Sequence, residues 1–179
     1  VCVRAWGQDD HHRIDHGKAE SEVPVIDMDY GFMKYTEGGE EVNGLVREGA
    51  GRPMVVMKCR NTKYVISDQV NSKGGEAYAV KLINHNIKNV MGYNRVIVKT
   101  DQEPAVKDLV EKVKLLKQIE IISESSVTKD SQSNPHAESA IKQVKGTCRA
   151  LKFALEKRLK ADIPDEHPIV AWLVKRAGQ

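Results

Sequence analysis

The order of apolar patterns along the chain predicts an α/β fold, in which helices flank a five-stranded mixed sheet. Three strand-like runs fill the first half, and helices and strands alternate in the second half. The 179 residues suit one compact domain with a substantial core. A hydrophobic fraction of 40% with 30% charged residues is typical of a soluble globular protein rather than a disordered one.

The first half of the chain contains three predicted strands. Residues 23–33 form the first, and the runs 54–57 and 64–67 form a hairpin through the turn at 60–63. The segment between the first two strands is rich in turn-forming glycines, namely Gly38, Gly39, Gly44, Gly49 and Gly51.

The second half alternates helices and strands. Apolar residues at helical spacing predict helices over 76–88 and 103–117, and short apolar runs predict strands at 96–98 and 119–122. The helix at 76–88 would be the crossover that makes the strands at 23–33 and 96–98 parallel neighbours.

A long helix follows a polar loop at residues 123–134. Pro135 suits its first position, with Asn134 or Ser133 as N-cap. Its apolar residues advance by threes and fours and define one buried face: Ala137, Ile141, Val144, Cys148, Leu151, Leu155 and Leu159. The last residues of the chain continue a helical pattern.

Three acids stand at the ends of these elements. Asp29 lies near the end of the first strand, Asp101 follows the strand at 96–98, and Glu138 is in the first turn of the long helix. Divalent cations such as Mg²⁺ prefer oxygen ligands of this kind, and two such ions can support in-line displacement at a phosphate. The pattern therefore predicts a site for Mg²⁺ or Mn²⁺, with two ions.

Each acid also has a simpler interpretation. Asp27 shares a strand face with Asp29 and is an alternative ligand. Asp101 can cap the helix that starts at Glu103. Glu138 can interact favourably with the dipole of its own helix.

The neighbours of the three acids resemble motifs of the catalytic core of retroviral and retrotransposon integrases and related DDE transposases. Residues 28–30 (MDY) are similar to the first-strand motif, residues 99–104 (KTDQEP) to the second-acid motif, and residues 130–134 (DSQSN) with Glu138 to the third. Thirty-six residues separate Asp101 from Glu138, close to the spacing in integrases. The resemblance covers residues 20 to 179 and implies a ribonuclease-H-like fold.

The resemblance implies metal-dependent phosphoryl transfer on DNA, with Asp29, Asp101 and Glu138 as catalytic metal ligands. The reactions would be 3′-end processing and strand transfer in the integration of a retroelement. DNA and further copies of the chain would be its partners, inside the cell in the nucleus or a virus-like particle. Pro135 stands where many relatives have glycine, so an inactive integrase-derived DNA-binding or assembly module is an alternative, as is a nuclease of the same fold.

A basic stripe follows Glu138 along the long helix. Lys142, Lys145, Arg149 and Lys152 share one face of it, although the formal net charge of the chain is only +3. The resemblance implies that these side chains and Asn134 bind DNA. A solvated helix face is the alternative.

Residues 1–21 are polar and predict a linker from a missing upstream module, and 22–179 would be a catalytic core truncated at its C-terminus. The histidines of the linker and Cys2 could belong to an upstream zinc module, but they do not make a complete four-ligand site. Cys59 and Cys148 are expected to be buried thiols in a reducing compartment. The sequence has no apolar run of membrane-spanning length, and its first residues do not follow the basic, apolar and cleavage pattern of a signal peptide.

Overall fold

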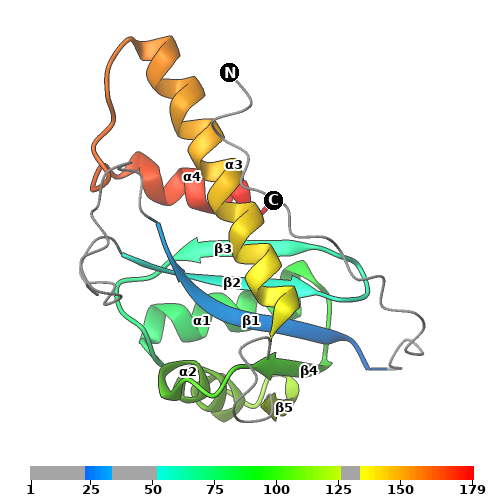
Figure 1. Ribbon diagram of the computed structural model, residues 1–179. Coiled ribbons are helices and arrows are strands. Elements are labelled where there is room, and N and C mark those ends of the chain that lie inside the picture. Colours follow the sequence, from blue (N-terminus) through cyan, green and yellow to red (C-terminus); the bar gives the residue numbers. More distant parts are fainter. Residues whose placement is uncertain (1–22, 34–51, 126–133) are drawn as a thin grey trace, which may run out of the picture.

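The computed structural model describes residues 23–33, 52–125 and 134–179. In these residues a five-stranded sheet has the order β3-β2-β1-β4-β5, and helices lie on both of its faces (Figure 1). The predicted fold class, a mixed five-stranded sheet flanked by helices, is confirmed. The predicted linker at 1–21 and the glycine-rich turns between residues 34 and 51 lie outside the described residues.

The first three strands form the antiparallel half of the sheet. β1 (Val25–Phe32) pairs with β2 (Pro53–Cys59), and β2 pairs with β3 (Val65–Gln69). The predicted hairpin between β2 and β3 is present, and the backbone N–H of Cys59 donates to the carbonyl of Tyr64 at 2.9 Å. β2 is apolar on both faces, with Val55 in one core and Val56 in the other, because helices cover both sides of the sheet.

The parallel half contains the predicted crossover. α1 (Ala77–His85) ends in one turn of π-helix, η1 (Asn86–Val90), and leads into β4 (Arg95–Thr100), which runs parallel to β1. α2 (Pro104–Leu115) then connects to β5 (Glu120–Ser125), parallel to β4. The prediction that the first and fourth strands are parallel neighbours near the sheet centre is confirmed.

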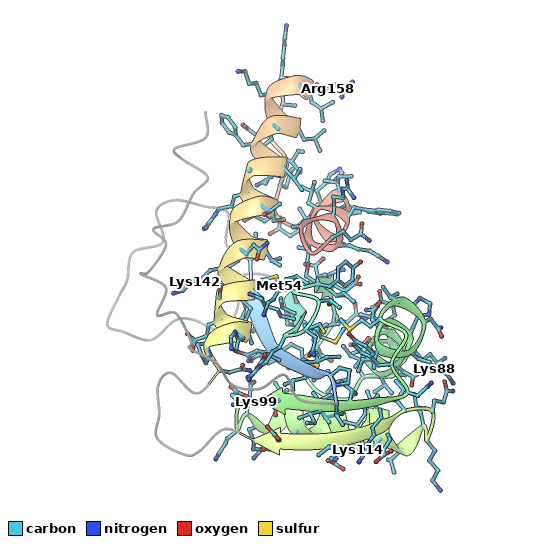
Figure 2. The ribbon with its side chains drawn as sticks, turned by 90° about the vertical axis from the view of Figure 1, so that its right-hand side faces the viewer. Met54, Lys88, Lys99, Lys114, Lys142 and Arg158 are labelled. Atoms are coloured by element: carbon cyan, nitrogen blue, oxygen red, sulfur yellow. The ribbon has the colours of Figure 1, made fainter. Side chains whose placement is uncertain are left out.

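Two apolar cores lie on opposite faces of the sheet. α1 and α2 cover one core, which contains Ile26, Met28 and Val98. α3 (Pro135–Leu159) and α4 (Ile169–Ala177) cover the other, and Figure 2 shows α3 and α1 on opposite sides of the strands. The expected burial of Cys59 and Cys148 is confirmed. No helix of the described ranges has the length and apolar character to cross a membrane.

α3 packs directly against β1 at Gly31. A Cβ atom built at this position would lie 2.7 Å from Met54 Cε and 3.1 Å from Ile141 Cγ2, closer than carbon atoms normally approach. The missing side chain therefore allows the helix to lie close to the strand that carries Asp29.

Candidate metal centre

Asp29 and Asp101 meet where the parallel pairing of β1 and β4 ends, with Asp29 inside β1 and Asp101 directly after β4. The register of β1 and β4 pairs Asp27 with Lys99, and two residues further along each chain it brings Asp29 beside Asp101. A carboxylate oxygen of each, together with one from Glu103, forms a group whose atoms all lie within 4.8 Å of one another. This edge of an α/β sheet is where ligands commonly bind.

Backbone hydrogen bonds orient both aspartates. The N–H of Tyr30 donates to Asp29 Oδ1 at 2.7 Å, and the N–H of Glu103 donates to Asp101 Oδ1 at 2.9 Å. The second contact closes a turn just before α2, whose N-cap residue is Glu103, so Asp101 is not the cap of that helix.

The environment of Asp29 disfavours its negative charge. Burial is the largest cause, and together with the charges of Asp101 and Glu103 it raises the pKa of Asp29 from 3.8 to about 6, against the lowering effects of the Tyr30 N–H and the Lys73 ammonium. The three carboxylates offer the all-oxygen ligands that a hard divalent cation binds. The residues present therefore fit such an ion.

Lys73 places a positive charge beside this group. Its ammonium pairs with Glu103 Oε1 at 2.6 Å and lies 4.9 Å from the centroid of the Phe32 ring. Lys73 belongs to the loop between β3 and α1, where the Tyr30 hydroxyl accepts from the Gly74 N–H at 3.0 Å.

The sequence patterns do not single out Glu103 or Lys73. Glu103 is predicted only as the first residue of a helix, and the structure does place it immediately before α2. The sequence feature that could have indicated Glu103 is its position two residues after Asp101. An aspartate often accepts from the backbone N–H two residues later, and here this contact brings the two acids together.

Glu138 does not join the carboxylate group. It lies exposed in the first turn of α3, as predicted, but outside the set formed by Asp29, Asp101 and Glu103 in the described residues. Its role as third ligand stays a prediction.

Asn134 connects the start of α3 to β1. Its side chain is 2% exposed, and its Nδ2 donates to the carbonyl of Met28 at 3.4 Å, whereas its Oδ1 has no hydrogen-bond partner among the described residues. Asn134 is the N-cap residue, as expected, although its side chain makes no capping hydrogen bond. This contact holds the first turn of α3 over the strand that carries Asp29.

Asp27, the alternative ligand, is used differently. It is fully buried, and its two carboxylate oxygens accept from Arg60 Nε and Nη2, both at 2.6 Å. A bidentate guanidinium partner satisfies this carboxylate. His136 of α3 lies near the pair: burial lowers the pKa of His136, and the Asp27 charge opposes that effect.

The basic stripe lies along α3. Lys142 and Arg149 are exposed and Lys145 is half-buried, and Figure 2 shows Lys142 pointing away from the sheet. Lys152 instead pairs with Asp165 at 2.8 Å and with Glu156 at 3.6 Å. DNA binding by these side chains and by Asn134 stays a prediction.

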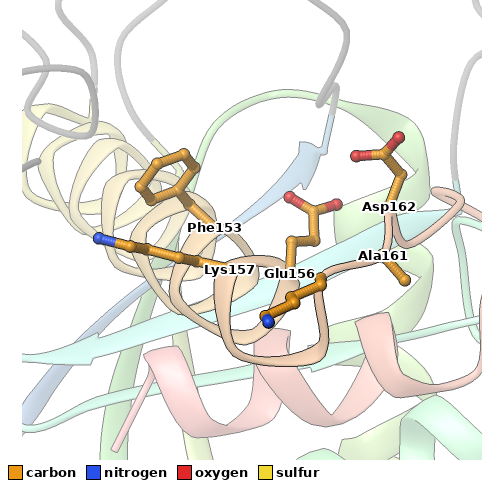
Figure 3. Close-up of a pocket in the computed structure, with 6 residues that line it drawn as sticks. Phe153, Glu156, Lys157, Ala161 and Asp162 are labelled. Atoms are coloured by element: carbon orange, nitrogen blue, oxygen red, sulfur yellow. The ribbon is translucent and has the colours of Figure 1, made fainter.

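An open hollow of about 470 Å³ lies at the other end of α3 (Figure 3). Phe153, Glu156 and Lys157 are among the side chains that line it. Phe153 follows Glu138 by fifteen positions in α3, which correspond to roughly 22 Å along the helix axis. The hollow is therefore separate from the carboxylates.

No protein-family model and no curated protein sequence matches this chain. Among solved structures, the catalytic core domain of BIV integrase is 13% identical over 86% of this chain and 80% of its own, with a TM-score of 0.49. A chain of the simian T-cell lymphotropic virus intasome in complex with PP2A regulatory subunit B56 gamma is 14% identical, with a TM-score of 0.56. That match covers 95% of this chain and 53% of the other, so this chain spans about half of its length.

At such identities the likeness is one of fold. The mixed sheet with its flanking helices is the ribonuclease-H-like fold of the integrase catalytic core.

Proposed function

We propose that this protein is a DDE-type polynucleotidyl transferase that processes and joins DNA 3′ ends with Mg²⁺ or Mn²⁺ in the integration of a retroelement. The observation that carries the proposal is the meeting of Asp29 and Asp101 where the parallel pairing of β1 and β4 ends. The integrase-core fold supports it.

Asp29 and Asp101 would hold the cations, with Glu138 as the third ligand from α3. Bound divalent ions activate an attacking oxygen and stabilise the leaving oxygen of a phosphodiester. The backbone N–H groups of Tyr30 and Glu103 fix the ligand oxygens of Asp29 and Asp101, so little reorganisation of these two side chains is needed.

The substrate would be duplex DNA, bound along the basic stripe of α3. Lys142 and Lys145 lie one and two turns beyond Glu138 on the same helix, so phosphates bound there would lead into the carboxylate group. Assembly of several copies around two DNA ends and a location in the nucleus or a virus-like particle belong to the same proposal.

The test is an assay of the chain on labelled duplex ends with Mg²⁺ or Mn²⁺. Shortening of one 3′ end followed by joining to a second duplex is the expected result. Cleavage of the duplex ends, with no joined product even when a pre-processed end is supplied, would instead indicate a nuclease of the same fold.

One observation favours a second candidate, a non-catalytic DNA-binding or assembly module. Glu138 stands outside the carboxylate group, and Pro135 occupies the start of its helix, where it restricts the backbone. DNA binding without any cleavage in either metal would support that candidate and overturn the proposed activity.

A further inference from the structure

We propose that Glu103 is an additional ligand of the metal centre and that Lys73 competes with the divalent cation for its carboxylate. The inference rests on the proposed function, because it concerns the same site. It assigns a role to a residue pair outside the predicted set of Asp29, Asp101 and Glu138, and it predicts how strongly the site binds its ion.

Glu103 is fixed relative to Asp101. Its backbone N–H donates to Asp101 Oδ1 at 2.9 Å, and one of its carboxylate oxygens lies within 4.8 Å of oxygens of both Asp29 and Asp101. Glu103 therefore presents an oxygen to the same space without any movement of the chain. Its side chain is 29% exposed, so the space around it remains open to a hydrated ion.

Lys73 supplies positive charge to that space. Its ammonium lies 2.6 Å from Glu103 Oε1, and its charge also lowers the pKa of Asp29. The ring of Phe32, 4.9 Å from the ammonium, favours the same position through a cation–π contact. A divalent cation that binds Glu103 must therefore displace this ammonium or share the carboxylate with it.

The loop that carries Lys73 is firmly held, so the ammonium returns to one place. The Tyr30 hydroxyl accepts from the Gly74 N–H and donates to its carbonyl, at 3.0 and 3.2 Å. The N–H of Gly75 donates to Asp108 Oδ2 at 2.7 Å. The loop backbone can stay in place while the flexible four-carbon stem of lysine moves its charge away from Glu103.

Competition of this kind sets a threshold for metal binding. With Lys73 on Glu103 the site is partly neutralised and stable without an ion, and the cation binds only when its concentration is high enough to offset the broken ion pair. Because both partners are partly exposed, removal of the lysine charge should raise metal affinity on the order of fivefold.

The experiment measures Mn²⁺ affinity by isothermal titration calorimetry on the metal-free chain. Lys73→Met should tighten binding about fivefold, and Lys73→Arg, which keeps the charge, should not. Glu103→Gln should weaken binding, and Lys73→Met should have no further effect in that background. Lys112→Met is the matched control, because Lys112 pairs with Asp108 beside the same loop and should not change the affinity.

Equal tightening by Lys73→Met in the wild-type and Glu103→Gln backgrounds would overturn the inference, because the lysine would then act only through its general charge. Unchanged affinity in Glu103→Gln would overturn it as well. If Lys73→Met does not fold, Lys73→Gln gives the same comparison. If Mn²⁺ does not bind, or binds equally well after Asp101→Asn, the proposed function itself is overturned. If binding requires Asp101 but is unchanged by Glu103→Gln, only this inference is overturned.

Discussion

Asp29 and Asp101 occupy matching positions on two parallel strands, two residues beyond the pair formed by Asp27 and Lys99. Their carboxylates, with that of Glu103, form the one acidic group of metal-binding size among the described residues. Burial and the neighbouring negative charges raise the pKa of Asp29 to about 6. Under the proposed function, catalysis, stability and metal binding would all depend on these carboxylates.

Neutralising a ligand should abolish phosphoryl transfer. Asp101→Asn and Glu138→Gln should each lower the rate of 3′-end processing by more than about 100-fold, since even residues that only support metal ligands are worth 10- to 100-fold. Circular dichroism should show an intact fold. Glu120→Gln, on exposed β5, is the control and should retain activity. Wild-type turnover in Glu138→Gln would remove Glu138 from the ligand set.

Asp29→Asn should stabilise the metal-free protein at neutral pH. Because the folded pKa of Asp29 is raised from 3.8 to about 6, the folded state favours the protonated acid. Its contribution to stability is therefore fully present below the unfolded pKa and is lost as the pH rises through about 6. After allowance for solvent screening, Asn should gain about 1 kcal/mol at pH 7.5 and nothing at pH 3. Urea unfolding across this range measures the difference, and a gain that does not vary with pH would contradict it.

A divalent cation should make the wild-type protein more stable than Asp29→Asn at neutral pH, the reverse of the order expected without metal. A bound cation stabilises the ionised carboxylates and only the folded state presents them together, so Mn²⁺ should raise the melting temperature of the wild-type protein. Asp29→Asn should show a much smaller rise. Differential scanning calorimetry with and without chelator makes the measurement, and equal rises in both proteins would contradict metal binding at Asp29.

The Arg60–Asp27 pair should respond unequally to removal of its two partners. Asp27 is fully buried, whereas 29% of the Arg60 side chain is exposed and can reach water. Arg60→Met leaves a buried carboxylate without its partner and should cost about 3 kcal/mol. Asp27→Asn should cost less, because the arginine can turn outward. Urea unfolding at pH 7 tests the order, and the reverse order would contradict this prediction.

The basic stripe should control the salt dependence of DNA binding. Lys142→Ala with Lys145→Ala should weaken binding and reduce the log–log salt slope by about one unit for each phosphate that is no longer neutralised. Lys107→Ala with Lys114→Ala removes the same charge from α2 on the other face of the sheet. Fluorescence anisotropy at several salt concentrations compares the pairs. If both double variants change the affinity and the salt slope equally, the stripe contributes only its general positive charge and no specific phosphate contacts.

The strand ends could be predicted from local sequence because periodicity and the acids' neighbours are local signals. Asp27 and Asp29 are distinguished by Arg60, which follows the next strand and pairs with Asp27 only after the sheet forms, whereas Asp29 lies in the carboxylate group. Glu103 could not be predicted as a site residue because its local pattern indicates a helix start equally well. The orientation of Glu138 depends on how α3 packs at Gly31 and Asn134, and no local pattern encodes that packing.

The parallel pairing of β1 and β4 also determines when the metal centre can exist during folding. The antiparallel strands β1, β2 and β3 follow one another along the chain, whereas β4 reaches β1 only after the crossover through α1. Such non-local pairing is slow, because closing the long loop costs entropy before the strands gain any stabilisation from pairing. Of the three clustered carboxylates, only Asp29 belongs to the antiparallel strands β1, β2 and β3, whereas Asp101 and Glu103 follow β4. Under the proposed function, metal binding would report completion of the central sheet, and an ion added early in refolding should accelerate only the steps that follow the docking of β4.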